Sequence, residues 1–517
     1  MNNTTGLLKA VIVYAVCVPL AIWLGWMLTS LEDLTRSTYI EAAIFVLLLC
    51  LPLLLRWHYI MLVFCINFSM TIFFLPGKPM VWMPMVAISL GISVLQRALN
   101  KEMHFISVPR ISLPLILLVV VALATAKLTG GIGLNSFGGD LVGGHKYFLL
   151  IGGILAYFAL TARRIPPERA GLYVGLFFLS QCSSVIGDLI SLLPSGFNFL
   201  SWFFPPNSYI IQEQTVDTGG FRFIGLSIMS GTIVMFMLAK YGVRGIFMSG
   251  KPWRLFLFVL FNFLMLFGGF RSRLIFCAMI FAIQFFLEGM HRTRLMPKLV
   301  FAGLLVIALA VPFADKLPNV VQRSLALLPL NIDPAVRADA QATSDWRVEM
   351  WIAVLPEVPE HLLLGKGYVL SRMELETMGK DTAFHPVSAA DWDSALAGDY
   401  HSGPLSVVLS FGIWGVIGFS WFLIAAIRAL YANYRYGDPV LRNINTLLLA
   451  AFLGKTLLFI IIFGAFDADM LFFAGIIGLS VSLNGGVCRP ATEPVETFAP
   501  APASSRPRLQ PEFQRQT

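Results

Sequence analysis

The sequence predicts an all-α integral membrane protein that crosses the bilayer many times. Hydrophobic residues make up 57% of its 517 residues, charged residues only 13%, and the mean hydropathy is +0.77. A soluble domain carries about 25% charged residues. Apolar runs of about 20 residues, each long enough to cross a bilayer as a helix, recur along almost the whole chain.

About fourteen runs meet this length criterion, so we expect about 12–14 transmembrane helices. The first run is long and has no clear small-residue cleavage site, which predicts a retained span rather than a cleaved signal peptide. The runs lie near residues 8–29, 38–55, 58–76, 79–96, 112–129, 147–162, 170–193, 223–240, 255–270, 274–289, 298–314, 403–427, 444–464 and 468–484.

Lysine and arginine are concentrated in alternate loops, which predicts the orientation of the spans. The loops on the other side are short and carry few basic residues. An even number of spans then places both termini in the cytoplasm, and the net charge of +8 reflects anchoring at the inner leaflet. A nucleic-acid-binding protein would instead need a basic stripe on a soluble face, and the sequence shows none. The basic clusters are 97–110, 163–169, 240–254, 292–298, 428–442 and 489–515.

Four segments divide the chain: an N-terminal membrane bundle (1–314), a large periplasmic loop (315–402), C-terminal spans (403–484) and a cytoplasmic tail (485–517). The loop is expected to be partly helical, because Trp346, Met350 and Val354 recur at helical spacing before Pro356 ends the pattern. The tail is rich in Pro, Ala, Ser and Arg, a composition typical of disorder.

The cysteines argue against a disulfide or a structural zinc site. None of the six lies in the large loop, and the chain has no Cys-x-x-Cys and no His/Cys ligand spacing.

Four side chains are the main candidates for chemistry, and the predicted topology places all of them on the outer side. Arg222, Arg273 and Arg347 carry guanidinium groups, which bind phosphate through two parallel hydrogen bonds. His401 carries an imidazole, the side chain best suited to accept a proton near neutral pH. This combination fits an enzyme that handles a lipid-linked diphosphate.

These residues lie in four short motifs that follow one another along the chain. Together the motifs resemble the O-antigen ligase and O-antigen polymerase superfamily of bacterial envelope biogenesis, over roughly residues 220–425. One departure is that Ser402 and Gly403 follow the histidine, where the family often has Asn. The motifs are an Arg-x-x-Gly that opens a span, a Ser-Arg at the outer start of a later span, an Arg-x-x-x-Trp that leads to a Gly-x-Gly, and a His-x10-Gly at the return to the membrane (Arg222, Gly225; Ser272, Arg273; Arg347, Trp351, Gly365, Gly367; His401, Gly412).

The resemblance implies a GT-C-type glycosyltransferase of the bacterial inner membrane, acting at the periplasmic face. Its donor would be a glycan on undecaprenyl diphosphate. Its acceptor would be a sugar hydroxyl, on lipid A–core for a ligase or on another growing chain for a polymerase. We expect the ligase type because the His-x10-Gly follows one long outer segment, and an O-antigen or exopolysaccharide polymerase with the same chemistry stays open.

The residue roles follow from the resemblance and from the charges that the reaction develops. Arg222 and Arg273 are expected to bind the diphosphate, with Arg347 assisting and Arg271 as the alternative to its neighbour. His401 would remove the acceptor proton as general base. Trp351 would support the site. Arginines would take the place of a divalent cation, so no metal and no cofactor is expected.

Each candidate also has a structural interpretation. Arg271 and Arg273 would anchor a span at the lipid headgroups. Arg347 would form a surface ion pair, which contributes little stability. His401 would be an interfacial residue before the span that begins at Gly403, and His385 is a rival base.

Lys455 lies in the middle of an apolar run, where a cation is costly and suggests either a structural ion pair or a substrate role. Its partner would be Asp467, Asp469 or Asp188. Asp467 and Asp469 are also candidates for orienting His401 or an acceptor sugar.

Two functions of other classes compete with an enzyme. A transporter or flippase of lipid-linked glycans should show paired interrupted spans and polar groups near the bilayer midplane. A scaffold for envelope synthesis would leave His401 and the arginines unexplained.

Overall fold

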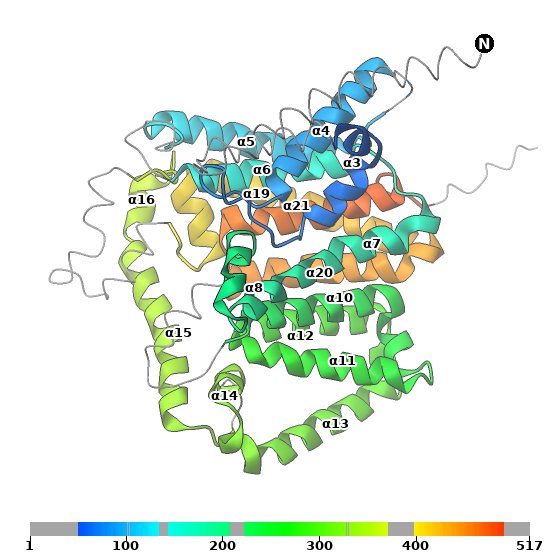
Figure 1. The fold of residues 1–517 in the computed structure, drawn as a ribbon, viewed down its shortest axis with the longest axis vertical. Helices are drawn as coiled ribbons and strands as arrows, with labels where there is room; N and C mark the ends of the chain where they lie inside the picture. Colours follow the sequence, from blue (N-terminus) through cyan, green and yellow to red (C-terminus); the bar gives the residue numbers. More distant parts are fainter. Residues whose placement is uncertain are drawn as a thin grey trace, which may run out of the picture.

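A computed structural model describes residues 50–100, 102, 104–133, 143–206, 222–326, 328, 330–370 and 398–490. Over these residues the protein is helical, with no strand, and an isolated bridge joins Thr71 to Met80 (Figure 1). The all-α, multi-pass architecture predicted from the sequence is therefore confirmed. The predicted span near 8–29, the rival base His385 and the tail beyond 490 lie outside the described residues.

The principal helices, in chain order, are α3 (Leu51–Cys65), α4 (Trp82–Leu99), α5 (Pro109–Leu128), α6 (Gly144–Leu160), α7 (Ala170–Leu179), α8 (Ser184–Ile190), α10 (Ile224–Phe247), α11 (Pro252–Leu264), α12 (Arg271–Leu287), α13 (Leu295–Ala310), α14 (Asn319–Leu325), α15 (Pro334–Val354), α16 (Glu357–His361), α19 (Gly403–Tyr436), α20 (Arg442–Ile461) and α21 (Phe466–Asn484).

Seven described helices are long and apolar enough to cross a membrane, and four shorter apolar helices accompany them. The span predicted near 38–55 lies largely outside the described residues, and the helix in the span predicted near 58–76 ends early, because α3 ends at Cys65. Polar groups after α3 bind a neighbouring element instead of continuing the helix: the Asn67 amide donates to the Phe177 carbonyl at 2.7 Å, and the Ser69 main-chain N–H donates to Ser183 Oγ at 2.9 Å.

The core lies where α6, α19, α20 and α21 meet (Figure 1). In α21, 78% of the apolar stretch is buried inside the protein. Small residues allow this close approach, as is common between membrane helices. A Cβ on Gly153 would come within 2.9 Å of the Leu471 main chain, and one on Gly478 within 3.0 Å of Leu160. Helices α6 and α21 are thereby packed closely against each other.

α19 is interrupted at Gly412, whose φ of 60° departs from the helix. The Gly-x-Gly segment lies against this interruption: the main-chain N–H of Lys366 donates to the Leu409 carbonyl at 2.8 Å and that of Gly367 to the Ser410 carbonyl at 3.0 Å. A Cβ on Gly365 would overlap the main chain of Ser410. The glycines of the last two sequence motifs therefore have a packing role, because they let residues 361–370 dock on α19.

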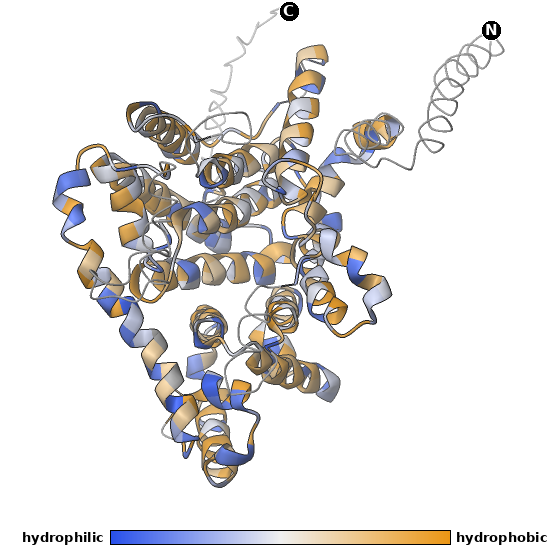
Figure 2. Cartoon of the chain, turned by 60° about the vertical axis from the view of Figure 1, so that its left-hand side comes forward, coloured by the Kyte–Doolittle hydropathy of each residue, from blue (hydrophilic) through white to orange (hydrophobic). Residues whose placement is uncertain are grey.

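α15 stands apart from the apolar bundle and runs along one end of it, with polar residues interspersed along its length (Figure 2). It confirms the helix predicted from Trp346, Met350 and Val354, and it begins a further three turns upstream. Asp333 caps its start by accepting from the Ala335 N–H at 2.8 Å, and Pro334 occupies the first turn, where proline is favoured.

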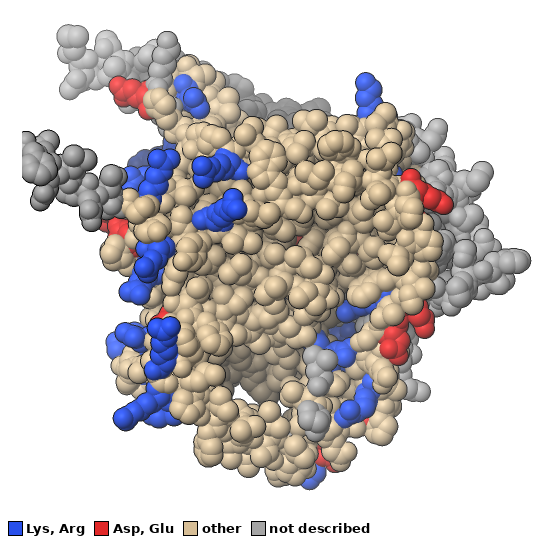
Figure 3. Space-filling view, turned by 180° about the vertical axis from the view of Figure 1, so that it is seen from behind, with Lys and Arg blue, Asp and Glu red and all other residues tan. Residues whose placement is uncertain are grey.

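Charged residues form two rims around a broad face that carries almost none (Figure 3). One rim is dominated by Lys and Arg, and the opposite rim, on the side of α15, carries both signs. Helix α19 begins shortly after His401 and carries Arg435 in its last turn.

Candidate active site

His401 occupies a strained turn directly before α19. Its φ of 50° lies in the left-handed region, which is uncommon for a residue other than glycine and is often found at functional sites. The ring is 15% exposed. It packs edge to face between Trp346 of α15 and Phe463, with centroid distances of 5.0 and 5.3 Å. Two separate elements therefore fix its orientation.

The hydrogen bond of His401 determines which nitrogen can accept a proton. Nδ1 lies 3.0 Å from the main-chain carbonyl oxygen of Asp399. A carbonyl oxygen only accepts, so Nδ1 carries the hydrogen and the neutral ring has its lone pair on Nε2. Within the part of the chain that the structure describes, Nε2 has no hydrogen-bond partner. The ring is thus prepared to act as a base through Nε2.

Arg347 and His401 share one aromatic neighbour. The Arg347 guanidinium lies over the Phe463 ring at 5.7 Å, a distance typical of a cation–π contact, and the same ring packs on His401. One turn later on α15, Trp351 Nε1 donates to the Tyr400 carbonyl at 2.8 Å. Two of the predicted site residues are therefore brought together, and Trp351 holds the residue that precedes His401.

The two neighbouring arginines at the start of α12 have different surroundings. Arg271 donates to the Ala340 carbonyl and, at 3.2 Å, to Ser344 Oγ, both on α15. Arg273 lies in the first turn of α12, whose N-cap Phe270 has no side chain able to cap the free N–H groups. Arg271 thus tethers α15, and both arginines belong to the first turn of a helix whose N-terminus favours anions.

Arg222 lies against the same helix start. It is 6% exposed, and its Cδ and Nε would be 3.3 Å from a Cβ on Gly269, which has a φ of 69°. The Phe223 N–H donates to the Phe267 carbonyl at 3.0 Å and fixes the chain beside this turn. The structure therefore groups Arg222 with the start of α12 and groups Arg347 with His401, and Arg271 connects the two groups through α15.

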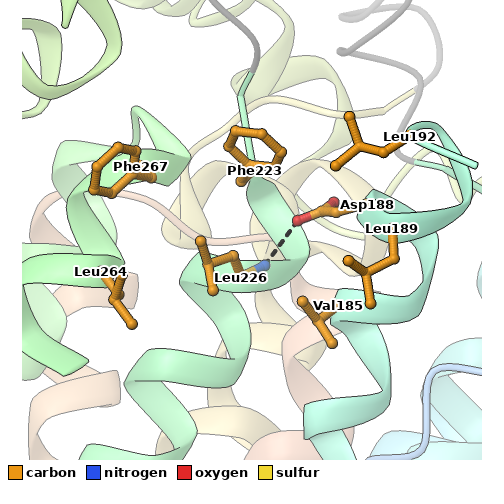
Figure 4. Close-up of a pocket in the computed structure, with 8 residues that line it drawn as sticks. All are labelled: Val185, Asp188, Leu189, Leu192, Phe223, Leu226, Leu264 and Phe267. Carbon is orange, nitrogen blue, oxygen red and sulfur yellow. Dashed lines mark hydrogen bonds between the residues drawn. The ribbon is translucent and has the colours of Figure 1, made fainter. Parts of the chain in front are cut away.

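An apolar groove opens next to Arg222, between α8, α10 and the turn before α12 (Figure 4). Its one charged lining residue is Asp188, whose Oδ2 accepts from the Leu226 main-chain N–H at 2.8 Å. Asp188 therefore binds α10 and is not the partner of Lys455. The groove is lined by Val185, Asp188, Leu189, Leu192, Phe223, Leu226, Leu264 and Phe267.

Lys455 pairs with Asp469, one of its three predicted alternatives. Its Nζ is 2.6 Å from Asp469 Oδ1, and the two side chains are only 11% and 15% exposed. Asp467 is also buried and lies within electrostatic range of Lys146, at the start of α6. No contact joins Asp467 or Asp469 to His401 within the described residues.

The carboxylate beside His401 is that of Asp399, which sequence reasoning missed together with Phe463 and Trp346. Asp399 Oδ1 is 3.4 Å from His401 Nδ1. The sequence does show an aspartate two residues before the histidine. Side chains two residues apart contact each other only at an unusual turn, so this spacing alone did not predict the contact. Among the described residues there is no group of three or more His, Cys, Asp or Glu side chains with the geometry of a metal site.

Residues 255–420 match the model of the O-antigen ligase family, named Wzy_C. A search of curated proteins returns no match. The matched stretch contains Arg271, Arg273, Arg347 and His401, and it begins downstream of Arg222. This family comprises membrane glycosyltransferases of the ligase and polymerase type. The segment from α11 to the middle of α19 is therefore similar to the O-antigen ligase family, as the sequence motifs predicted.

Proposed function

We propose that the protein is an O-antigen ligase-type glycosyltransferase that moves a glycan from undecaprenyl diphosphate to a sugar hydroxyl at the periplasmic face of the inner membrane. The observation that carries the proposal is the state of His401: a fixed imidazole whose Nδ1 is engaged and whose Nε2 is available, beside Arg347. A transporter has no need of a base held in this way.

The arrangement supplies the groups that direct displacement needs. Nε2 of His401 takes the proton of the acceptor hydroxyl as its oxygen attacks the anomeric carbon. The departing diphosphate gains negative charge, which Arg222, Arg273 and the uncapped N-terminus of α12 stabilise. Arginines thereby perform the charge neutralisation that a divalent cation performs in other enzymes, and the displacement inverts the anomeric centre.

The distribution of charge supports a periplasmic site. Cytoplasmic loops of membrane proteins are enriched in Lys and Arg. Figure 3 shows a rim rich in these residues opposite the side of α15, and Trp346 of α15 packs against His401. The apolar groove beside Arg222 supports entry of the donor from the bilayer, with its isoprenoid chain in the groove and its diphosphate at the arginines.

The test is glycan transfer by purified protein from a lipid-diphosphate-linked oligosaccharide, in the presence of EDTA. We expect transfer by the wild type to survive chelation and to collapse in His401→Asn. A wild type that becomes inactive in EDTA and recovers with added cation would contradict the role given to the arginines. Undiminished transfer by the variant would remove His401 as the base.

The acceptor distinguishes a ligase from a polymerase. The matched family is described as a ligase family, which favours lipid A–core over a second lipid-linked glycan. Offering both acceptors in parallel reactions tests this: a product that grows only on the lipid-linked glycan would establish the polymerase alternative.

A further inference from the structure

The turn at His401 brings two acceptors of one residue to the same ring nitrogen. The main-chain oxygen of Asp399 is 3.0 Å from Nδ1, and its carboxylate Oδ1 is 3.4 Å from the same atom. This arrangement depends on the φ of 50° at His401, which folds the ring back over Asp399. A local distortion of about 1–3 kcal/mol is normally retained only where the surrounding structure requires it.

The carbonyl and the carboxylate differ in what they do for the ring. The carbonyl is sufficient to fix the tautomer, because it holds the hydrogen on Nδ1. The carboxylate adds a negative charge beside Nδ1, which attracts the cation that the ring becomes when Nε2 accepts a proton. Asp399 is 48% exposed, so solvent screens this attraction.

The other charges near the ring do not supply this role. Arg347 on α15 is a cation and lies against Phe463. The turn at 462–465 and the first turn of α19 contain no titratable side chain. Asp467 acts on Asp399 electrostatically but has no contact with the ring in the described structure. Asp399 is therefore the carboxylate placed to respond when the ring gains a proton.

We propose that Asp399 is a positioning residue that orients His401 and stabilises its imidazolium during glycan transfer. The inference rests on the proposed function. As the acceptor oxygen bonds to the anomeric carbon, the bond from that carbon to the diphosphate oxygen breaks, and its electron pair leaves with the diphosphate. The hydroxyl proton moves to Nε2, and the resulting cation is held by Asp399 at Nδ1 until the proton passes to water.

The variant Asp399→Asn tests the charge while keeping the main-chain carbonyl and the side-chain shape. We expect the transfer rate at its plateau to fall roughly tenfold. Asp399→Glu, which keeps the charge, should restore the rate in part. The exposed Asp345→Asn, which removes one charge from α15, should leave the rate close to that of the wild type.

A second readout is independent of catalysis. In protein labelled with ¹⁵N at histidine, NMR reports the hydrogen bond at each ring nitrogen, and the His401 signals are identified by their absence in His401→Asn. Asp399→Asn should shift the Nδ1 signal of His401. An unchanged signal would overturn the inference whatever the activity, whereas a shifted signal in a protein without transfer activity would retain the pair and refute the proposed function.

Discussion

Two acid–base pairs of this protein have opposite designs. Lys455 and Asp469 lie 2.6 Å apart between α20 and α21, and both side chains are largely buried. His401 and Asp399 lie 3.4 Å apart, and the carboxylate is half exposed. In the first pair, the ammonium and the carboxylate are each other's partner. In the second, Nε2 of the ring has no hydrogen-bond partner among the residues that the structure describes.

The contrast assigns different roles to two ionisable residues that are both unusual in a membrane protein. A buried charge is tolerated when a partner satisfies it, and such a pair then holds helices in one arrangement. We infer that Lys455 and Asp469 are structural. A ring held by two aromatic side chains, with one nitrogen engaged and one available, is instead suited to chemistry.

The largest effect should separate activity from stability at His401. His401→Asn removes the base but suits the left-handed φ, which asparagine tolerates better than most residues. Transfer should fall by about 10²–10⁴-fold, the usual contribution of a general base. The thermal unfolding midpoint in detergent should stay close to that of the wild type. A large loss of stability with the same loss of activity would instead indicate a structural histidine.

The second effect should appear in stability. Lys455→Met leaves Asp469 as an unpaired buried carboxylate, which we expect to destabilise the bundle by about 3–5 kcal/mol. Thermal unfolding of the purified protein measures this.

Two further variants sharpen the comparison at Lys455. The double variant Lys455→Met/Asp469→Asn should recover much of the loss, because no unpaired charge remains. Lys298→Met, at an exposed lysine on α13, controls for the loss of a cation. A stable single variant that has lost transfer activity would move Lys455 from the structural class to the substrate site.

The same contrast shows what the sequence could predict. Apolar runs and helical periodicity predicted the spans and the helix at Trp346–Val354, because both depend on local pattern. Charge and residue type identified His401 and Arg347, and the structure places both against Phe463. The number of spans stays a prediction, since the first 49 residues lie outside the described part.

Long-range pairing could not be predicted in the same way. Three carboxylates were compatible with Lys455, and only the packing of α20 on α21 selects Asp469. Asp399 was missed because its contact requires the φ of 50° at His401. The span predicted near 170–193 appears as the candidate span Pro167–Ile190, and the 3₁₀ turn inside it at residues 180–183 was not predicted. There Ser183 Oγ donates to the Ser180 carbonyl at 2.8 Å.

The arginines at the start of α12 offer a third test. Arg273→Lys should reduce transfer by about 10²–10³-fold, since a lysine cannot bind a diphosphate through two parallel bonds. Arg271→Lys should reduce transfer less and lower thermal stability more, because Arg271 donates to two groups of α15. Steady-state kinetics and unfolding of both variants measure the difference. The reverse result would assign the diphosphate to Arg271.

The smallest expected effect concerns Trp351, which supports the site without belonging to it. Trp351→Phe deletes the 2.8 Å hydrogen bond to the Tyr400 carbonyl and should destabilise the protein by about 1 kcal/mol. Because Tyr400 precedes His401, transfer should fall a few-fold. Trp414→Phe, at an exposed tryptophan of α19, is the matched control. A loss as large as that of His401→Asn would mean that Trp351 contacts the substrate. No loss would mean that Trp346 and Phe463 position the ring without help from the preceding residue.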